Sequence, residues 1–333
     1  MTQQKSTTPS PNQTMTPAGG SHFTADWAVH AEKAAARRHP LGDLLAEFSR
    51  NRVAYLLSLP AMLLVVLVSF LPIAYAFVVS LYQTRYMELR SFFWLGNYQR
   101  LFSEPAAQKD VFNSLVYAFG SLALAVPLGM VLAILLNQPI RFRAIYRVIL
   151  IAPWVVSQTI VALLWSWLLN GNYGPLVDIL GVLGLQRVDL LGSTETAMPA
   201  VIAANVWQSY PFALILILAA LQTAPPELYE AVSIDGGNYW HGFRYVTFPF
   251  IRSTLLVVVI MLSLHYFNMV TLVLTMTAGG PVNATETVSL LAYKEAFMSW
   301  RIGVASAVGV VIFLVNMVLS LIYIRVLRRE PLY

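Results

Sequence analysis

The sequence lacks cysteine and has few charged residues. With no cysteine among 333 residues, disulfide bonds, thiolate zinc sites and thiol catalysis are excluded. Charged residues make up 11% of the chain, whereas soluble domains usually contain about a quarter. Hydrophobic residues make up 58%, so we expect most of the chain to lie in membrane lipid. No basic stretch is interleaved with aromatic residues, and we therefore expect no nucleic-acid partner.

The first 52 residues differ in composition from the rest. Residues 1–24 are rich in Ser, Thr, Pro, Gln and Gly, which predicts a disordered cytoplasmic tail. Apolar residues between Pro40 and Phe48 recur at helical spacing with arginines on both sides. This pattern predicts a short amphipathic helix, lying on the membrane surface or packed on a neighbouring subunit. The first long apolar run begins only near Val53, so we expect no signal peptide.

Residues 53–333 are predicted to form one all-α transmembrane domain. A helix needs about 20 apolar residues to cross the hydrocarbon core. Six segments reach this length, and they contain no Asp, Glu or Lys. Because backbone polar groups must be hydrogen-bonded inside lipid, these segments are expected to be helices rather than strands. The predicted spans are Tyr55–Leu81, Leu115–Leu136, Val148–Leu169, Ala197–Leu221, Leu255–Met276 and Val304–Leu327.

The distribution of basic residues predicts the orientation in the membrane. If the N-terminus is cytoplasmic, the cytoplasmic segments carry most of the arginines and lysines. The rule that cytoplasmic loops are basic then places both termini inside the cell, in a multi-pass protein of the plasma or inner membrane. The first outer loop is itself basic, since it contains Arg85, Arg90, Arg100 and Lys109.

The cytoplasmic loop between the fourth and fifth predicted spans reads as two short helices joined by glycine. Pro226 suits the first turn of a helix, and Gly236 or Gly237 can end that helix in the left-handed conformation. Asn238 can cap a second short helix, which we expect to end at Pro249 before the fifth span begins. Such a helical pair is suited to binding in a groove of another protein.

This loop, residues 223–250, resembles the EAA loop of ATP-binding-cassette import permeases. That pattern runs E-A-A, three residues, G, and then about nine residues to I-x-L-P. The chain departs from it at Val232, Gly237, Val246 and Phe248, with size or apolarity roughly kept. The residues that carry the resemblance, and to which it assigns coupling to an ATPase, are Glu230, Ala231, Asp235, Gly236, Phe243 and Pro249.

The resemblance implies that the loop is a coupling helix docked in a cleft of a separate ATPase subunit. Glu230 would contact the ATPase, Ala231 would fit the cleft because it is small, and Gly236 would allow close backbone approach. The chain contains no phosphate-binding G-x-x-x-x-G-K-[ST] motif. We therefore expect it to bind no cofactor and to have no catalytic site, with ATP and Mg²⁺ on the partner subunits.

Further residues resemble the carbohydrate-importing branch of these permeases. The Gly279-Gly280-Pro281 sequence after the fifth span resembles the G-G-P turn of maltose-type and glycerol-phosphate-type permeases. Trp207 and Pro211 resemble a W-x-x-x-P pattern of the same branch. The resemblance covers roughly residues 55–327. It implies a second permease subunit, two ATPase subunits and an extracytoplasmic sugar-binding protein as partners.

Polar and aromatic residues in the fourth and fifth spans are the candidates for substrate binding. Sugars are neutral and rich in hydroxyls, so their sites need amides, hydroxyls and aromatic rings. In the maltose-type permeases the sugar contacts come from these same two helices. The alternative is that these residues only bind neighbouring helices. The candidates are Trp207, Gln208, Ser209, Phe212, His265, Tyr266, Asn268 and Met269.

Two other classes of function compete with ATP-driven import. A secondary transporter or channel would contain carboxylates or other paired ionisable residues within its spans, or internal repeats; the spans contain no Asp, Glu or Lys, and no repeat is evident. A membrane enzyme would gather carboxylates or histidines at one face. Asp178, Asp189 and Glu195 share an outer loop, but their spacing suggests no metal site or acid–base pair. His265 has no second ligand in its span, so we expect no metal site there.

Overall fold

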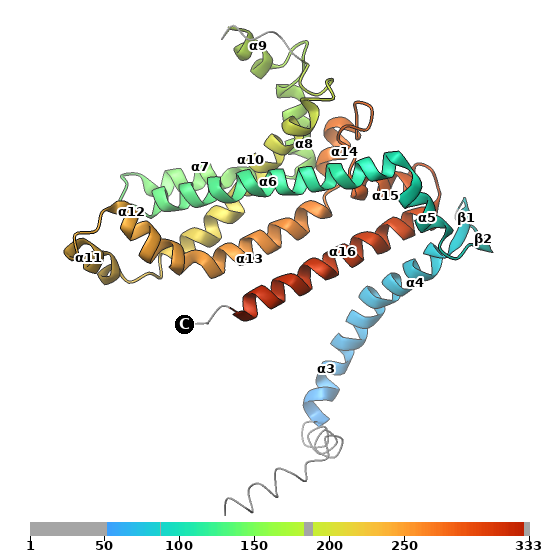
Figure 1. Ribbon diagram of the computed structural model, residues 1–333, viewed down its shortest axis with the longest axis horizontal. Coiled ribbons are helices and arrows are strands. Elements are labelled where there is room, and N and C mark those ends of the chain that lie inside the picture. The colour runs from blue at the N-terminus through green and yellow to red at the C-terminus, as the bar shows by residue number, and fades with distance from the viewer. Residues whose placement is uncertain (1–51, 87, 183–188, 330–333) are drawn as a thin grey trace, which may run out of the picture. The chain divides into compact units, whose positions relative to one another are not determined.

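The computed structural model describes residues 52–86, 88–182 and 189–329 (Figure 1). The tail and the amphipathic helix predicted for the N-terminal residues fall outside this part of the chain. The described residues are helical except for one two-stranded hairpin and the connecting loops. The chain divides into two compact units, Met1–Leu71 and Pro72–Tyr333, and each is described by itself.

The described part of the first unit is an apolar helix. α3 (Arg52–Val65) continues into a π-helical segment, η1 (Val66–Phe70). Its side chains are almost all exposed, including Leu57 at 76%, as expected for a helix that lipid surrounds. The apolar run continues into α4 (Leu71–Ser80), the first element of the second unit. Residues 55–80 together are long and apolar enough to cross a membrane.

The second unit is a bundle built around one buried helix. α10 (Ala197–Leu221) is buried along most of its length and has the bounds that the sequence predicts. It packs along α6 (Pro105–Asn137) and against α13 (Phe248–Phe267). α13 also lies beside α16 (Ile302–Arg329), and α6, α13 and α16 run side by side in Figure 1. α6 begins ten residues before the predicted second span.

The third predicted span is wrong as a single helix. It consists of α7 (Arg143–Val155) and α8 (Gln158–Leu168), whose axes are bent by 97°. Pro153 lies two residues before α7 ends, and Val156 is extended with ψ of 136°. Proline removes a helical hydrogen bond. Breaking the helix here therefore costs little additional free energy. Counting this pair as one span, six segments of the described chain can cross a membrane.

The fifth predicted span is also broken. α13 ends at Phe267, and a separate short helix, α14 (Thr271–Thr277), follows. The Asn268 side-chain amide donates a hydrogen bond to the Leu264 carbonyl at 2.7 Å. Asparagine side chains that bond the backbone in this way compete with continued helix formation. The prediction of one helix rested on hydrophobicity, which does not register this competition.

The remaining elements lie in the loops between the spans. A hairpin of β1 (Tyr82–Arg85) and β2 (Glu88–Phe92) follows α4 and pairs Tyr82 with Phe92. The sequence analysis did not predict it. Short helices complete the loops: α5 (Gly96–Ser103), α9 (Pro175–Val182), α11 (Pro226–Ile234), α12 (Tyr239–Gly242) and α15 (Val288–Phe297), with the π-helical segment η2 (Phe243–Thr247).

Small residues bring α6 and α10 close together. A Cβ atom added at Gly129 of α6 would lie 2.6 Å from the Ala213 Cβ and 2.9 Å from the Tyr210 carbonyl oxygen of α10. Ala125 and Ala133, one turn before and after, are fully buried. Membrane helices associate through such small residues because lipid provides no hydrophobic drive between them.

We predict that Gly129→Ala destabilises the bundle. The new methyl group overpacks the α6–α10 contact, at a cost of about 1–3 kcal/mol. Gly309→Ala in α16 is the matched control, because a Cβ atom there meets nothing within 4 Å and alanine favours helix by about 1 kcal/mol. Thermal unfolding of the detergent-purified protein measures both. If the Gly129 variant unfolds at or above the temperature of the Gly309 variant, the proposed close contact is wrong.

Candidate functional site

The first helix of the loop between α10 and α13 ends as its glycines predict. Pro226 occupies the first turn of α11. Gly236 has φ of +77°, its N–H donates to the Ser233 carbonyl at 3.2 Å, and the Gly237 N–H donates to the Val232 carbonyl at 2.8 Å. These two bonds form a Schellman motif, which closes a helix with a left-handed residue.

The second part of the loop is continuous with α13. Asn238 caps α12 as predicted, accepting hydrogen bonds from the N–H groups of Trp240 and His241. The expected helix end at Pro249 is wrong, because α12, η2 and α13 follow one another without a break. Pro249 lies in the first turn of α13, and the π-helical bond from the Phe248 N–H to the Phe243 carbonyl precedes it. Proline needs no N–H partner in a first turn.

The loop is fixed at its base and exposed at its tip. The Tyr229 hydroxyl hydrogen-bonds the Thr247 hydroxyl at 3.1 Å, joining α11 to η2. Ile234, at the end of α11, is 84% exposed. Tyr239 and Trp240 of the same loop are 72% and 62% exposed, and exposed apolar side chains that gather in this way mark a surface for protein contact. Of the residues predicted to couple to an ATPase, Phe243 is half-buried, and the exposed ones are Glu230, Ala231, Asp235, Gly236 and Pro249.

A cavity of about 410 Å³ lies where the broken helices meet α10 and α13. Polar side chains of α8, α10 and α13 face it, together with two aromatic rings, those of Trp154 and Phe212, whose centroids are 6.3 Å apart. None of its lining residues is Asp, Glu, Lys or Arg. The lining comprises Trp154, Val156, Gln158, Asn205, Gln208, Ser209, Phe212, Met261, Leu262 and His265.

Hydrogen bonds hold some polar lining groups in place and leave others free. The Gln208 amide donates to the Val156 carbonyl at 3.0 Å, across the break between α7 and α8. The Ser209 hydroxyl contacts the Asn205 carbonyl and the Tyr266 hydroxyl, each at 2.6 Å. Asn205 is 1% exposed, and both polar atoms of its side chain lack a partner within the described residues. A buried amide without partners is costly, so a ligand that reached this side chain would gain its hydrogen bonds.

Four of the eight predicted substrate residues line the cavity: Gln208, Ser209, Phe212 and His265. Tyr266 lies behind it, 2% exposed, and orients Ser209. Trp207 packs edge-on against Trp165, and Met269 is buried in the core. The Asn268 side chain forms hydrogen bonds with the Leu264 carbonyl and the Asn316 amide. These last four do not line the cavity, and their role in binding stays a prediction.

Trp154 was not among the predicted substrate residues, although the sequence contains a signal for it. It follows Pro153, the proline beside which the third span breaks. A helix break inside a membrane span exposes backbone groups and often borders a binding site. Gln158 lies just after the same break and reaches His265, with 3.4 Å between the two side-chain nitrogens.

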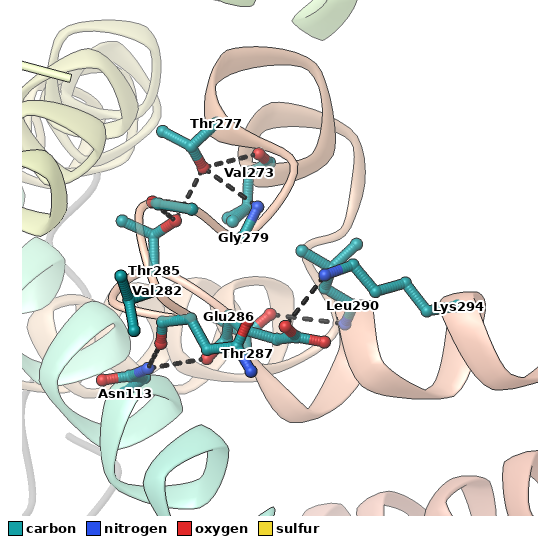
Figure 2. Close-up of polar contacts among 12 residues, drawn as sticks. Asn113, Val273, Thr277, Gly279, Val282, Thr285, Glu286, Thr287, Leu290 and Lys294 are labelled. Carbon is teal, nitrogen blue, oxygen red and sulfur yellow. Dashed lines mark hydrogen bonds and ion pairs between the residues drawn. The ribbon is translucent and has the colours of Figure 1, made fainter. Parts of the chain in front are cut away.

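A second ordered loop follows α14, at the end of the bundle opposite α11 (Figure 1). Figure 2 shows the Asn113 amide of α6 donating to two carbonyls of this loop, including that of Glu286 at 2.9 Å. The hydroxyls of Thr277 and Thr285 lie 2.6 Å apart, and Glu286 pairs with Lys294 at 2.8 Å. The loop contains the Gly279-Gly280-Pro281 sequence and is therefore fixed to both α6 and α15.

Comparison with known proteins establishes the family. The sequence model described as "Binding-protein-dependent transport system inner membrane component" matches residues 125–330. The chain belongs to this family. It is 33% identical to a probable ABC transporter permease protein of Brucella suis, over 84% of this chain and 99% of the relative.

Two further relatives and one solved structure extend the comparison. The trehalose/maltose transport system permease protein MalF of Thermococcus litoralis is 31% identical over 85% of this chain and 96% of the relative. The sn-glycerol-3-phosphate transport system permease protein UgpA of Pectobacterium atrosepticum is 28% identical over 86% of this chain and 97% of the relative. A chain of a bacterial ABC transporter for alginate import matches with a TM-score of 0.75 and 23% identity, covering 87% and 99% of the two chains. This match shows the fold, that of a type I importer permease.

We predict that Gly236→Ala loosens the end of α11, because a left-handed alanine costs about 1–2 kcal/mol. Gly236→Asn is the matched control, since asparagine adopts this conformation more readily. Amide hydrogen exchange of the full chain in detergent measures the effect. The alanine variant should exchange about tenfold faster at the α11 end, and the asparagine variant should stay close to the wild type. Equal exchange in all three would contradict the Schellman motif.

Proposed function

We propose that this chain is one of two permease subunits of an ATP-driven importer of neutral carbohydrates. The observation that carries the proposal is the cavity, which is lined by the rings of Trp154 and Phe212 and by Asn205, whose buried amide has no partner in the described part of the chain. Amides and hydroxyls suit sugar hydroxyl groups, and aromatic faces suit the apolar face of a sugar ring. The relative that bears the name of a trehalose/maltose permease supports a carbohydrate substrate.

The absence of formal charge in the cavity lining favours a neutral sugar. A phosphate, sulfonate or carboxylate group would need a lysine or arginine to offset its desolvation. The lining offers the amides of Gln158, Asn205 and Gln208, the hydroxyl of Ser209 and the imidazole of His265. These uncharged groups suit a neutral sugar better than an anionic compound such as sn-glycerol 3-phosphate, for which one relative is named.

The proposed complex contains a second permease, two ATPase subunits that bind ATP and Mg²⁺, and an extracytoplasmic sugar-binding protein. The exposed tip of the loop, with Glu230, Ala231 and Ile234, is the proposed ATPase contact. Both termini and this loop would then lie in the cytoplasm. Closure of the ATPases would switch the permeases between inward-open and outward-open states by rigid-body movement. In this account the chain itself has no catalytic site and binds no metal.

We predict that Asn205→Leu weakens transport without unfolding the protein. The substitution removes the free amide, and the loss of one or two sugar hydrogen bonds should raise the transport KM about tenfold. Asn316→Leu is the matched control, because it also removes an amide from a span, but Asn316 lies outside the cavity. Sugar uptake by proteoliposomes containing the whole complex measures both. An unchanged KM in the Asn205 variant would contradict this position for the sugar.

Co-purification with the products of neighbouring genes, followed by an ATPase assay, tests the whole proposal. A second permease and an ATPase should accompany the chain, and a binding protein loaded with one neutral sugar should stimulate hydrolysis. A secondary transporter or channel is the alternative. If the purified chain alone moves solute in liposomes without ATP, that alternative is right and the importer proposal is wrong.

A further inference from the structure

A basic pocket of about 410 Å³ lies at the β1–β2 hairpin and shares no lining residue with the cavity described above. The β1–β2 hairpin, α5 and the start of α16 form its walls. Four arginines line it, together with two aromatic residues whose backbones are left-handed, Tyr86 and Trp300. The arginines are Arg85, Arg90, Arg100 and Arg301.

The backbone around this pocket is tightly held. The Asn97 amide, 3% exposed, donates to the carbonyls of Ser80 and Tyr82 at 2.8 and 2.9 Å. The Gly303 N–H donates to the Thr84 hydroxyl at 2.7 Å, and a Cβ atom at Gly303 would lie 2.4 Å from the Tyr82 carbonyl oxygen. The hairpin is therefore fixed to both α5 and α16, and the arginines project from an ordered frame.

Three of the four arginines have no counter-ion within residues 52–86, 88–182 and 189–329. Arg301 pairs with Glu295. Arg85, Arg90 and Arg100 make no ion pair within the described residues, and Arg85 only lies over the Tyr86 ring at 5.7 Å. Glu88 faces Arg85 across the hairpin, but the two form no salt bridge. Like charges gathered around one pocket repel each other, and an anion in the pocket would relieve this repulsion.

The position of the pocket relative to the spans indicates where that anion comes from. α4 ends at Ser80, directly before the hairpin, and α16 begins at Ile302, directly after Arg301. Both are apolar helices that belong to predicted membrane spans. Exposed aromatic side chains surround this boundary, including Tyr86 and Trp94, each 71% exposed. Aromatic residues gather in this way at the level of the lipid headgroups.

We propose that this pocket binds the phosphate of an anionic phospholipid headgroup, with Arg85, Arg90 and Arg100 as its ligands. The guanidinium fork matches phosphate oxygens, and the arginines that share the pocket favour an anion between them. Leu95 and Phe102, 63% and 59% exposed, do not line the pocket, but they lie in the segment that supplies Arg100 and give that segment apolar surface for acyl chains. A soluble phosphate ester would have no use for that surface. This site is independent of the proposed sugar cavity.

Lipid titration of the full-length chain, purified in detergent, tests the proposal. The probes are dioleoylphosphatidylglycerol, dioleoylphosphatidylcholine and inorganic phosphate, with bound lipid counted by native mass spectrometry. The wild type should retain one phosphatidylglycerol in preference to phosphatidylcholine, and inorganic phosphate at the same concentration should not displace it. The double variant Arg90→Gln/Arg100→Gln should bind phosphatidylglycerol about tenfold more weakly or worse, because two charge-assisted hydrogen bonds are lost.

Two controls separate a specific site from general attraction. Lys109→Gln removes a positive charge from the same predicted outer loop, but from a position outside the pocket. This variant should keep its affinity for phosphatidylglycerol within about twofold of the wild type. The double variant Arg90→Lys/Arg100→Lys keeps the charge and should recover part of the binding. Unchanged gel-filtration profiles exclude misfolding as the cause of any loss.

Three results would overturn the proposal. The first is equal retention of the two lipids by the wild type, a comparison that needs no variant. The second is displacement of phosphatidylglycerol by inorganic phosphate at equal concentration, which would mean a soluble phosphate site. The third is unchanged lipid affinity in the glutamine variant together with weaker binding of the cognate sugar-binding protein. In that case the arginines dock an acidic protein surface.

Discussion

The hydrogen bond from the Gln208 amide to the Val156 carbonyl is the interaction on which the proposed site depends. Inside lipid a helix cannot break unless something satisfies the backbone groups that the break exposes. Gln208, on the buried helix α10, supplies that partner at 3.0 Å. The bond allows α7 and α8 to diverge by 97°, and the cavity opens beside the break. The same residue thus stabilises the fold and forms part of the cavity wall.

The continuity of α12, η2 and α13 gives a direct mechanical link from the loop to the cavity. This helical element runs from Tyr239 to Phe267, roughly 40 Å at 1.5 Å per residue. One end is joined to α11 through the Tyr229–Thr247 hydrogen bond, and the other carries Met261, Leu262 and His265 in the cavity lining. A rigid element moves as a unit, so displacement of the loop by a partner would move one wall of the cavity.

The sequence was sufficient to predict the spans and the loop, and insufficient to predict the breaks. Hydrophobic length located the six apolar regions without the breaks in the third and fifth. α10 has the predicted bounds because both of its ends coincide with polar turns. The caps at Gly236 and Asn238 were predictable because each depends on local residues. The break after Val155 depends on Gln208, which lies 52 residues later along the chain, and no local pattern encodes that contact. Trp154, beside Pro153, was missed because the third span was predicted as one unbroken helix. Trp207 and Met269 pack against or within the core, and their role in substrate binding stays a prediction.

The structure of the assembled complex with its sugar, determined by cryo-electron microscopy, tests the central claim most directly. Our account predicts sugar density in the cavity, with a hydroxyl group at hydrogen-bonding distance, about 3 Å, from the Asn205 amide and a ring stacked on Trp154 or Phe212. The claim would be contradicted if the sugar lay elsewhere in the membrane domain. It would equally be contradicted if a side chain of the second permease filled the cavity and bonded Asn205 in every state of the transport cycle.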